Sequence, residues 1–419
     1  MKPLSGGAAR SDLLRVIFLG ATLFVFTDGP LFFLSNDILG RPVVSWRDEV
    51  VAGGLTGAAA ACGALVAWDL WRTGGRSPRR PHRWAASAVV AFVVLAAASS
   101  LWSVGEAVHT GARAAVYAGL ALLAWLLADI RDTAWKPLAL MAAAGVAASL
   151  VTVAVDPATG VDPNGDWRGM YHNRNLLAPV AGVGVIAGVR LLGTGDRALR
   201  AAGAALGLGS LACMVGAGSR TAWLALGVGT GLAALPVLRA LLQRRWDPHR
   251  ASAAVWAALT AGATALVVVV IASWDTSTFA QRRTIWRVSW EQFLERPLHG
   301  HGFAAVWSWP EFLDHPERMG LGSAHNGLLE VMLGLGVLGT VPFAAIVVLA
   351  VGNAGRDLLR APSADTWMWA AVVVMMLIEN TTESFILRYS YNWVIVMAAA
   401  LRTPRGVGPR QRAAAVPRV

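Results

Sequence analysis

The chain has 419 residues, of which 56% are hydrophobic and only 15% are charged, and its formal net charge is +11. Soluble domains are about 45–50% apolar and about 25% charged, so this composition argues against a soluble globular protein. The basic residues lie mostly in short segments between apolar blocks, and no water-exposed domain with a basic face is visible, so we expect no nucleic-acid partner.

Apolar blocks of about 17–25 residues, long enough to cross a bilayer as helices, follow one another along the chain. They predict spans near residues 13–33, 50–70, 84–101, 114–130, 137–155, 175–192, 201–217, 221–238, 252–274, 326–351, 367–379 and 390–401. We therefore predict an all-α, polytopic integral membrane protein with about 12 transmembrane helices in one transmembrane domain, 1–419. The polar stretch Glu379–Tyr391 between the last two spans predicts a re-entrant or kinked break.

The basic residues also orient these spans. If the amino terminus is cytoplasmic, about two thirds of the 36 lysines and arginines fall in inner segments, as the positive-inside rule expects. An even number of spans then returns the basic tail, 402–419, to the cytoplasm. We expect both termini to be cytoplasmic.

The longest hydrophilic segment, residues 275–325, connects the ninth and tenth predicted spans and forms a large extracytoplasmic loop under this topology. Four apolar residues in it recur at the spacing of one helical face: Trp286, Trp290, Phe293 and Leu294. Val288 falls on the other side of that helix. The pattern predicts an amphipathic interfacial helix over about Arg282–Leu294, and simple anchoring by an aromatic belt is the alternative role.

Arginines in outer segments are not expected from the positive-inside rule. Their presence there is therefore better explained by a functional role than by membrane topology. Arg220 lies in a turn so short that it joins two spans almost without a loop, and its guanidinium is a fork of donors suited to phosphate oxygens. A snorkelling arginine at a helix end is an equal alternative. Arg282 and Arg283 open the predicted outer helix and Arg287 follows one turn later, where anchoring to lipid phosphates is the competing explanation.

His325 follows a glycine-rich loop and begins the tenth predicted span. An imidazole at that depth can be neutral near neutral pH and partly shielded, which suits a general base. A lone histidine at an interface more often only forms hydrogen bonds or snorkels, so the spacing to other features has to support the catalytic hypothesis.

The sequence carries no strong metal or cofactor motif. The acidic segment 162–166 has its glycine too early for a calcium-binding EF-hand loop and no closing glutamate, so it is better interpreted as a turn. We expect neither a metal nor a cofactor.

The histidine belongs to a longer pattern. His325-Asn326, followed by Gly336 and then Gly339-Thr340, is similar to the signature of the O-antigen ligase family. The preceding segment, 282–302, resembles the same family's arrangement of an arginine, a tryptophan and a Pro-x-x-Gly-x-Gly turn.

Two upstream pieces extend the resemblance to about residues 165–345. Gly218–Arg220 resembles the family's Ser-Arg at a span boundary. Gly169–Asn175, with Tyr171 in the place of a phenylalanine, resembles the entry to a central span in related exopolysaccharide polymerases. The four pieces occur in the family's order, which makes the set more specific than any one of them.

This resemblance implies a GT-C-like membrane glycosyltransferase in the bacterial cytoplasmic (inner) membrane. Such an enzyme moves a glycan from undecaprenyl pyrophosphate to the hydroxyl of a glycan, glycolipid or other acceptor on the outer face. By position, His325 would be the base, and Arg220 and Arg282 would hold the pyrophosphate, with Arg283 as the fallback for Arg282.

Further candidates for supporting roles are Asn175, Arg287, Asn326 and Glu330. Glu330 resembles the acidic position of the polymerase branch, and an interhelical hydrogen bond is its alternative role. The chemistry expected is a metal-independent, single displacement that inverts the anomeric centre.

Three alternatives remain open from the sequence. A polysaccharide polymerase would share the histidine and the arginines. A secondary transporter would use intramembrane arginine and histidine to line a pathway, although the two halves of the chain lack the matching broken helices that transporters usually have. A non-catalytic scaffold would bind anionic lipid through its arginines.

Overall fold

The structure is a computed structural model, and it describes residues 6–27, 29–30, 81–130, 133–243, 276–314, 322–385 and 390–403, together with the isolated residues 57, 64, 68, 247 and 250. Within these ranges the chain is helical, and the one strand-like feature is the isolated bridge between Val161 and Trp167. The all-α prediction is confirmed for this part of the chain.

The helices follow the predicted spans closely. In chain order they are α1 (Gly6–Val25), α4 (Arg83–Ala98), η1 (Ser99–Leu101), α5 (Ala107–Asp129), α6 (Trp135–Val155), α7 (Pro157–Gly160), α8 (Arg174–Leu192), α9 (Arg197–Ala217), α10 (Arg220–Gln243), α12 (Thr276–Glu295), η2 (Val306–Ser308), α13 (Pro310–Leu313), α14 (Gly327–Arg360), α15 (Ala364–Glu379) and α16 (Tyr391–Leu401). Each predicted span falls on one of them, except those near 50–70 and 252–274, which lie largely outside the described residues, as does most of the tail 402–419.

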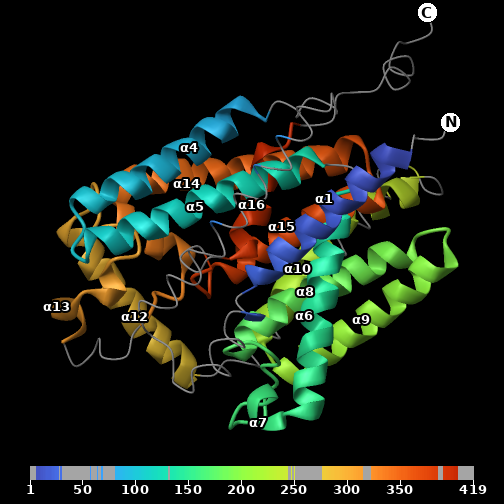
Figure 1. Cartoon of the computed structure of the whole chain (residues 1–419), viewed down its shortest axis with the longest axis horizontal. Coiled ribbons are helices and arrows are strands. Elements are labelled where there is room, and N and C mark those ends of the chain that lie inside the picture. Colours follow the sequence, from blue (N-terminus) through green and yellow to red (C-terminus); the bar gives the residue numbers. More distant parts are fainter. Residues whose placement is uncertain are drawn as a thin grey trace, which may run out of the picture.

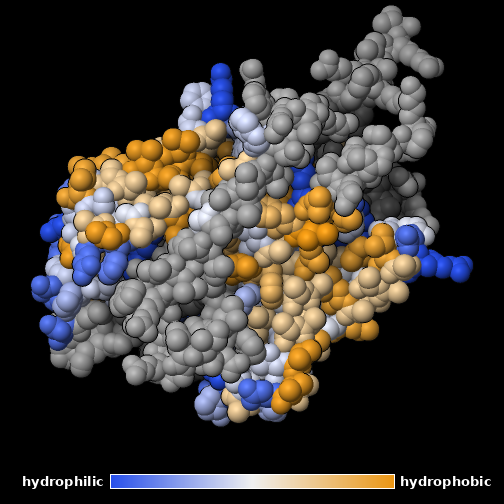
Figure 2. Space-filling view, viewed as in Figure 1, coloured by the Kyte–Doolittle hydropathy of each residue, from blue (hydrophilic) through white to orange (hydrophobic). Residues whose placement is uncertain are grey.

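Six of the described helices are long and apolar enough to cross a membrane: Arg83–Leu101, Ala107–Asp129, Trp135–Val155, Arg174–Leu192, Arg197–Ala217 and Gly327–Arg360. Their flanks expose apolar side chains, as Figure 2 shows along α4 and α9, while hydrophilic residues gather near α7 and α13. Exposing such apolar side chains to water is unfavourable, whereas exposing them to lipid is not. The chain is a multi-pass membrane protein. The number of 12 transmembrane helices and the orientation of the chain in the membrane stay predictions.

The helices pack in two groups that share α15 (Figure 1). One group contains α4, α5, α14 and α16, and the other contains α1, α6, α8 and α9. Helix α15 packs against α14 and α16 on one side and against α8 and α10 on the other. It therefore joins the two groups.

Backbone hydrogen bonds identify the two ends of this bundle. At one end the amide of His82 donates to the carbonyl of Leu401 (3.0 Å). At the other end Tyr391 donates to Phe26 (3.0 Å). The second end, which we call the site end, also carries α7, α12 and α13 (Figure 1).

The segment between α10 and α14 has an apolar core of its own, which changes the interpretation of α12. The core consists of Val288, Phe293, Val306, Phe312, Ala324 and Leu333. Thus Phe293 is buried together with Val288, whereas Trp290 and Leu294 are 47% and 55% exposed. The predicted helix exists, but its four-residue apolar stripe is divided between the protein interior and the surface, because helical periodicity does not tell a protein neighbour from lipid. An interfacial position for α12 stays a prediction.

Glycines let α8 and α9 approach closely. A Cβ added at Gly203 would lie 2.6 Å from the Cβ of Leu191 and 2.9 Å from the carbonyl oxygen of Gly188. A Cβ at Gly207, one turn later on the same helix, would meet nothing within 4 Å. Close contact between small residues is a usual source of helix association in membranes.

We therefore expect Gly203→Ala to lower the free energy of unfolding by about 1–3 kcal/mol, the usual cost of overpacking. Thermal unfolding in detergent measures it. Gly207→Ala is the matched control and should be neutral, because its methyl group enters open space. Equal effects of the two substitutions would contradict the close approach of α8 and α9.

Candidate active site

The site begins at the N-terminus of α14, where the chain turns sharply. Asn326 caps the helix, since its side-chain oxygen accepts the amides of Leu328 (3.0 Å) and Leu329 (3.2 Å). The preceding His325 has a φ of +47°, which is uncommon for a residue other than glycine. At Gly327 a Cβ would meet the side chain of Asn380 at 2.1 Å, so only glycine lets α14 start this close to the end of α15.

A buried carboxylate holds the loop that carries the histidine. Glu330 is 2% exposed and accepts the amide of Ala324 and the indole N–H of Trp307 (2.7 Å). The carbonyl of Ala324 in turn accepts the indole N–H of Trp286 (3.1 Å). Both backbone groups of the residue before His325 are therefore satisfied, which fixes the loop.

The glycines of the family-like pattern are explained by a break inside α14. Gly336 has a φ of +59°, and a Cβ there would lie 2.4 Å from the carbonyl carbon of Leu298. Around the break, the turn after α12 supplies hydrogen-bond partners: Val337 donates to Pro297 (2.9 Å) and Gly302 donates to Gly334 (2.9 Å). Backbone groups freed within a spanning helix need such partners, so this turn fastens the outer segment to α14.

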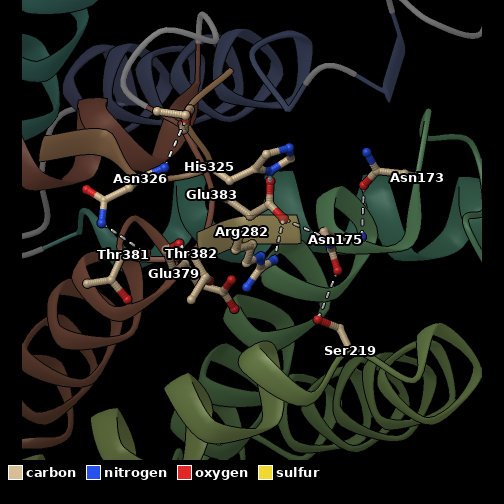
Figure 3. Close-up of polar contacts among 12 residues, drawn as sticks. Asn173, Asn175, Ser219, Arg282, His325, Asn326, Glu379, Thr381, Thr382 and Glu383 are labelled. Atoms are coloured by element: carbon tan, nitrogen blue, oxygen red, sulfur yellow. Dashed lines mark hydrogen bonds and ion pairs between the residues drawn. The ribbon is translucent and has the colours of Figure 1, made fainter. Parts of the chain in front are cut away.

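At the centre of the site, one carboxylate receives three donors (Figure 3). Glu383, just after α15, accepts the amide of Asn175 at 2.8 Å and a guanidinium N–H of Arg282 at 3.5 Å on Oε1, and its Oε2 lies 3.2 Å from Nδ1 of His325. Ser219 donates to the side-chain oxygen of Asn175 (3.3 Å). Side chains from α8, from α12 and from the residue before the cap of α14 thus meet at this carboxylate, and Ser219, in the turn before α10, is linked to it through Asn175.

Exposure separates the roles of these groups. The side chain of Glu383 is 9% exposed, that of Arg282 is 21% exposed and that of His325 is 35% exposed. The carboxylate is shielded, while the imidazole is open to a molecule entering from outside. By contrast, His301 is 1% exposed and stacks on Trp309. Burial lowers the pKa of its imidazole. His301 therefore contributes to the packing of the outer segment.

The structure brings some of the predicted residues together and separates others. Asn175, Arg282 and His325 meet at Glu383. Arg283, the fallback for Arg282, is exposed, and Arg287 pairs with Glu291 one turn along α12 (3.0 Å).

Arg220 is exposed and is the first residue of α10, directly after the Ser219 that bonds Asn175. It lies at the same end of the bundle as His325, as the pyrophosphate hypothesis requires. Asn326 and Glu330 support the loop around the histidine and do not join the cluster at Glu383.

Glu383 itself was missed from the sequence. A signal was present, since Glu383 lies in the polar stretch between the last two spans, and an ionisable residue at a span end is a functional candidate by default. Its partners are up to 208 positions away in the chain, which no local pattern reveals.

Comparison with known families agrees with this geometry. Residues 204–344 match the family described as O-antigen ligase. The match supports the assignment of this part of the chain to an O-antigen ligase or polysaccharide polymerase family. No curated protein matches the sequence.

The O-antigen ligase match includes Arg282 and His325 of the cluster and omits its two other members. It runs from α9 through Arg220, Arg282 and His325 and past the break at Gly336 to the middle of α14. Asn175 and Glu383 lie outside it. The match supports an O-antigen ligase-like membrane glycan-transfer enzyme. The structure adds Glu383, which contacts both Arg282 and His325, and Asn175, which donates to Glu383.

The loop around the histidine gives a first test. Trp307→Phe removes the indole N–H from the buried Glu330, and a buried acceptor that loses a donor costs about 1–3 kcal/mol. We expect this loss in thermal unfolding, together with faster hydrogen exchange of the amides at 322–326. Trp290→Phe, at a half-exposed indole on α12, is the control and should change neither. Unchanged exchange in Trp307→Phe would mean that Glu330 does not hold the loop.

Proposed function

We propose that this protein transfers a glycan from undecaprenyl pyrophosphate to an acceptor hydroxyl, on the outer face of the bacterial cytoplasmic membrane. The observation that carries the proposal is the accessible imidazole of His325, which is backed by a shielded carboxylate beside a guanidinium at one end of a membrane bundle. These three groups fit a base, its orienting partner and an anion-binding group.

His325 would act as the general base. Its Nδ1 faces Glu383, so a proton on Nδ1 leaves the lone pair of Nε2 available for the acceptor hydroxyl. Glu383 would hold that tautomer and stabilise the imidazolium formed when the proton moves. A positioned base of this kind contributes about 10²–10⁴-fold in rate.

The arginines would stabilise the leaving group. The acceptor oxygen forms a bond to the anomeric carbon, the bond from that carbon to the pyrophosphate oxygen breaks, and its electron pair stays on the pyrophosphate. Guanidinium groups at Arg282 and Arg220 are suited to this developing charge. Arg283, exposed on the same helix, is the less favoured partner.

The arrangement favours a single displacement with inversion. A double displacement needs a carboxylate free to attack the anomeric carbon. Glu383 is 9% exposed and holds three donors, which supports an orienting role instead of a nucleophilic one. Cationic side chains would supply the charge stabilisation that a metal provides in other enzymes, and a metal-independent reaction stays part of the proposal.

The membrane orientation is part of the same proposal. A polyprenyl pyrophosphate needs its headgroup at the surface of the bilayer, and the site lies at one end of the bundle. The first residues of α1 lie at the opposite end, as does the end of α16 (Figure 1). With the site end facing outward, both termini would be cytoplasmic, as the positive-inside rule predicts.

A polysaccharide polymerase is the closest alternative, because it would use the same donor and the same groups. The family match favours transfer over a secondary transporter or a lipid-binding scaffold.

Substitutions at the cluster test the roles of its members. We expect His325→Ala and Glu383→Gln each to lower kcat by about 10²–10⁴-fold, through loss of the base or of its orientation. Arg282→Ala should lower it by about 10²–10³-fold, as loss of one donor to a developing anion does. Transfer is measured with purified protein in lipid, with and without a chelator, which should have no effect.

His109→Ala is the matched control for the imidazole, because the side chain of His109 on α5 is 37% exposed, close to the 35% of His325, and also lies beside a glutamate, Glu106. Arg287→Ala is the control for the guanidinium, because its partner is Glu291. Wild-type turnover in His325→Ala would remove the base assignment.

The products separate ligase from polymerase. Polyprenyl-pyrophosphate glycan is incubated with candidate acceptors and the products are sized: a ligase adds one block, whereas a polymerase produces a ladder. The configuration of the new glycosidic bond is read by NMR, and we expect it to be opposite to that of the donor. A product that keeps the donor configuration would contradict the single displacement.

A further inference from the structure

A second carboxyl group lies behind the site. Glu379 is the last residue of α15, one helical turn before Glu383, and it is 2% exposed. Among the described residues, its Oε1 has no hydrogen-bond partner. Figure 3 shows it near Arg282, and Arg282 and Glu383 are the charged groups that act on it electrostatically. An ionised carboxylate buried without donors is far more costly than a neutral acid.

The two carboxyl groups differ in what surrounds them. Glu383 has a donor from each of three neighbouring elements: Asn175 on α8, Arg282 on α12 and His325 before α14. Such donors favour the ionised form.

On the side of α16, the group that interacts electrostatically with Glu379 is the phenol of Tyr391, which is 2% exposed and is a neutral group. Two carboxyl groups that share one site resist ionising together. Of the two carboxyl groups, Glu383 is therefore the better placed to carry a negative charge, because it has the donors that Oε1 of Glu379 lacks.

We propose that Glu379 is a neutral carboxylic acid in the working protein and a positioning residue that keeps the charge of the cluster suited to an anionic donor. With Glu379 neutral, one carboxylate, Glu383, faces one guanidinium, Arg282. An ionised Glu379 would add a negative charge beside that guanidinium and repel a pyrophosphate. This inference rests on the proposed function. It adds the requirement that Glu379, which lies outside the residues matched by the family, stays protonated.

Infrared spectroscopy tests the protonation state without turnover. In lipid at neutral pH, the spectrum of the wild type minus that of Glu379→Gln should contain the C=O stretching band of a protonated carboxylic acid. In the wild type alone, the same band should disappear on titration to alkaline pH. Glu291→Gln, at an exposed carboxylate of α12, is the control and should leave the band unchanged. Absence of the band from the difference spectrum would overturn the proposal, whether or not the protein transfers glycan.

The pH profile tests the role in binding. Glutamine imitates a neutral acid, so Glu379→Gln should keep transfer near the wild-type rate at neutral pH, whereas Glu383→Gln loses it. At alkaline pH the KM of the wild type for the donor should rise by about tenfold or more, with a smaller change in kcat, and the KM of Glu379→Gln should not rise. A loss in Glu379→Gln as large as that in Glu383→Gln would mean that Glu379 works as a carboxylate, and the proposal would be wrong.

Discussion

The carboxylate of Glu383 is the interaction on which the candidate site depends. It is shielded from solvent, so it needs hydrogen-bond donors, and it receives them from elements up to 208 positions away in the chain. The same contacts bring the imidazole of His325 and the guanidinium of Arg282 to one place. The hydrogen-bond requirement of one shielded carboxyl group thus brings together side chains that are far apart in the sequence.

A second constraint acts through the backbone. The break at Gly336 frees amides and carbonyls inside α14, and the turn Pro297–Gly302 pairs with them. Glycine is required at Gly336 because the left-handed φ and the contact with Leu298 exclude a Cβ. The outer segment is therefore fastened to α14 on one side of the site, while Glu330 holds the histidine loop on another. The glycines of the family-like pattern are structural, and they position the catalytic candidates without touching them.

Helix α12 differs from its sequence-based prediction in one respect. The stripe on α12 was assigned to a single apolar face, but Phe293 faces the core of the outer segment and Leu294 faces outward. Hydropathy measures how apolar a residue is, and it does not state whether lipid or protein covers it. The adjacent Arg282 and Arg283 were ambiguous for a related reason, since two neighbours on a helix point in different directions and only the packing shows which one meets Glu383.

The sequence by itself determined the helical class and the spans that fall on described helices, and it predicted the histidine as a site residue. These depend on local quantities: the length of an apolar block is set by the bilayer, and the histidine stands in a recognisable spacing. The sequence also placed a polar break between α15 and α16. Only the tertiary structure decided that Glu383 is the centre of the site, that Arg282 contacts it, and that Asn326 and Glu330 support the loop. Hydrogen bonds between distant side chains form only where packing brings them within reach, and that distance is a property of the assembled helices and not of any segment.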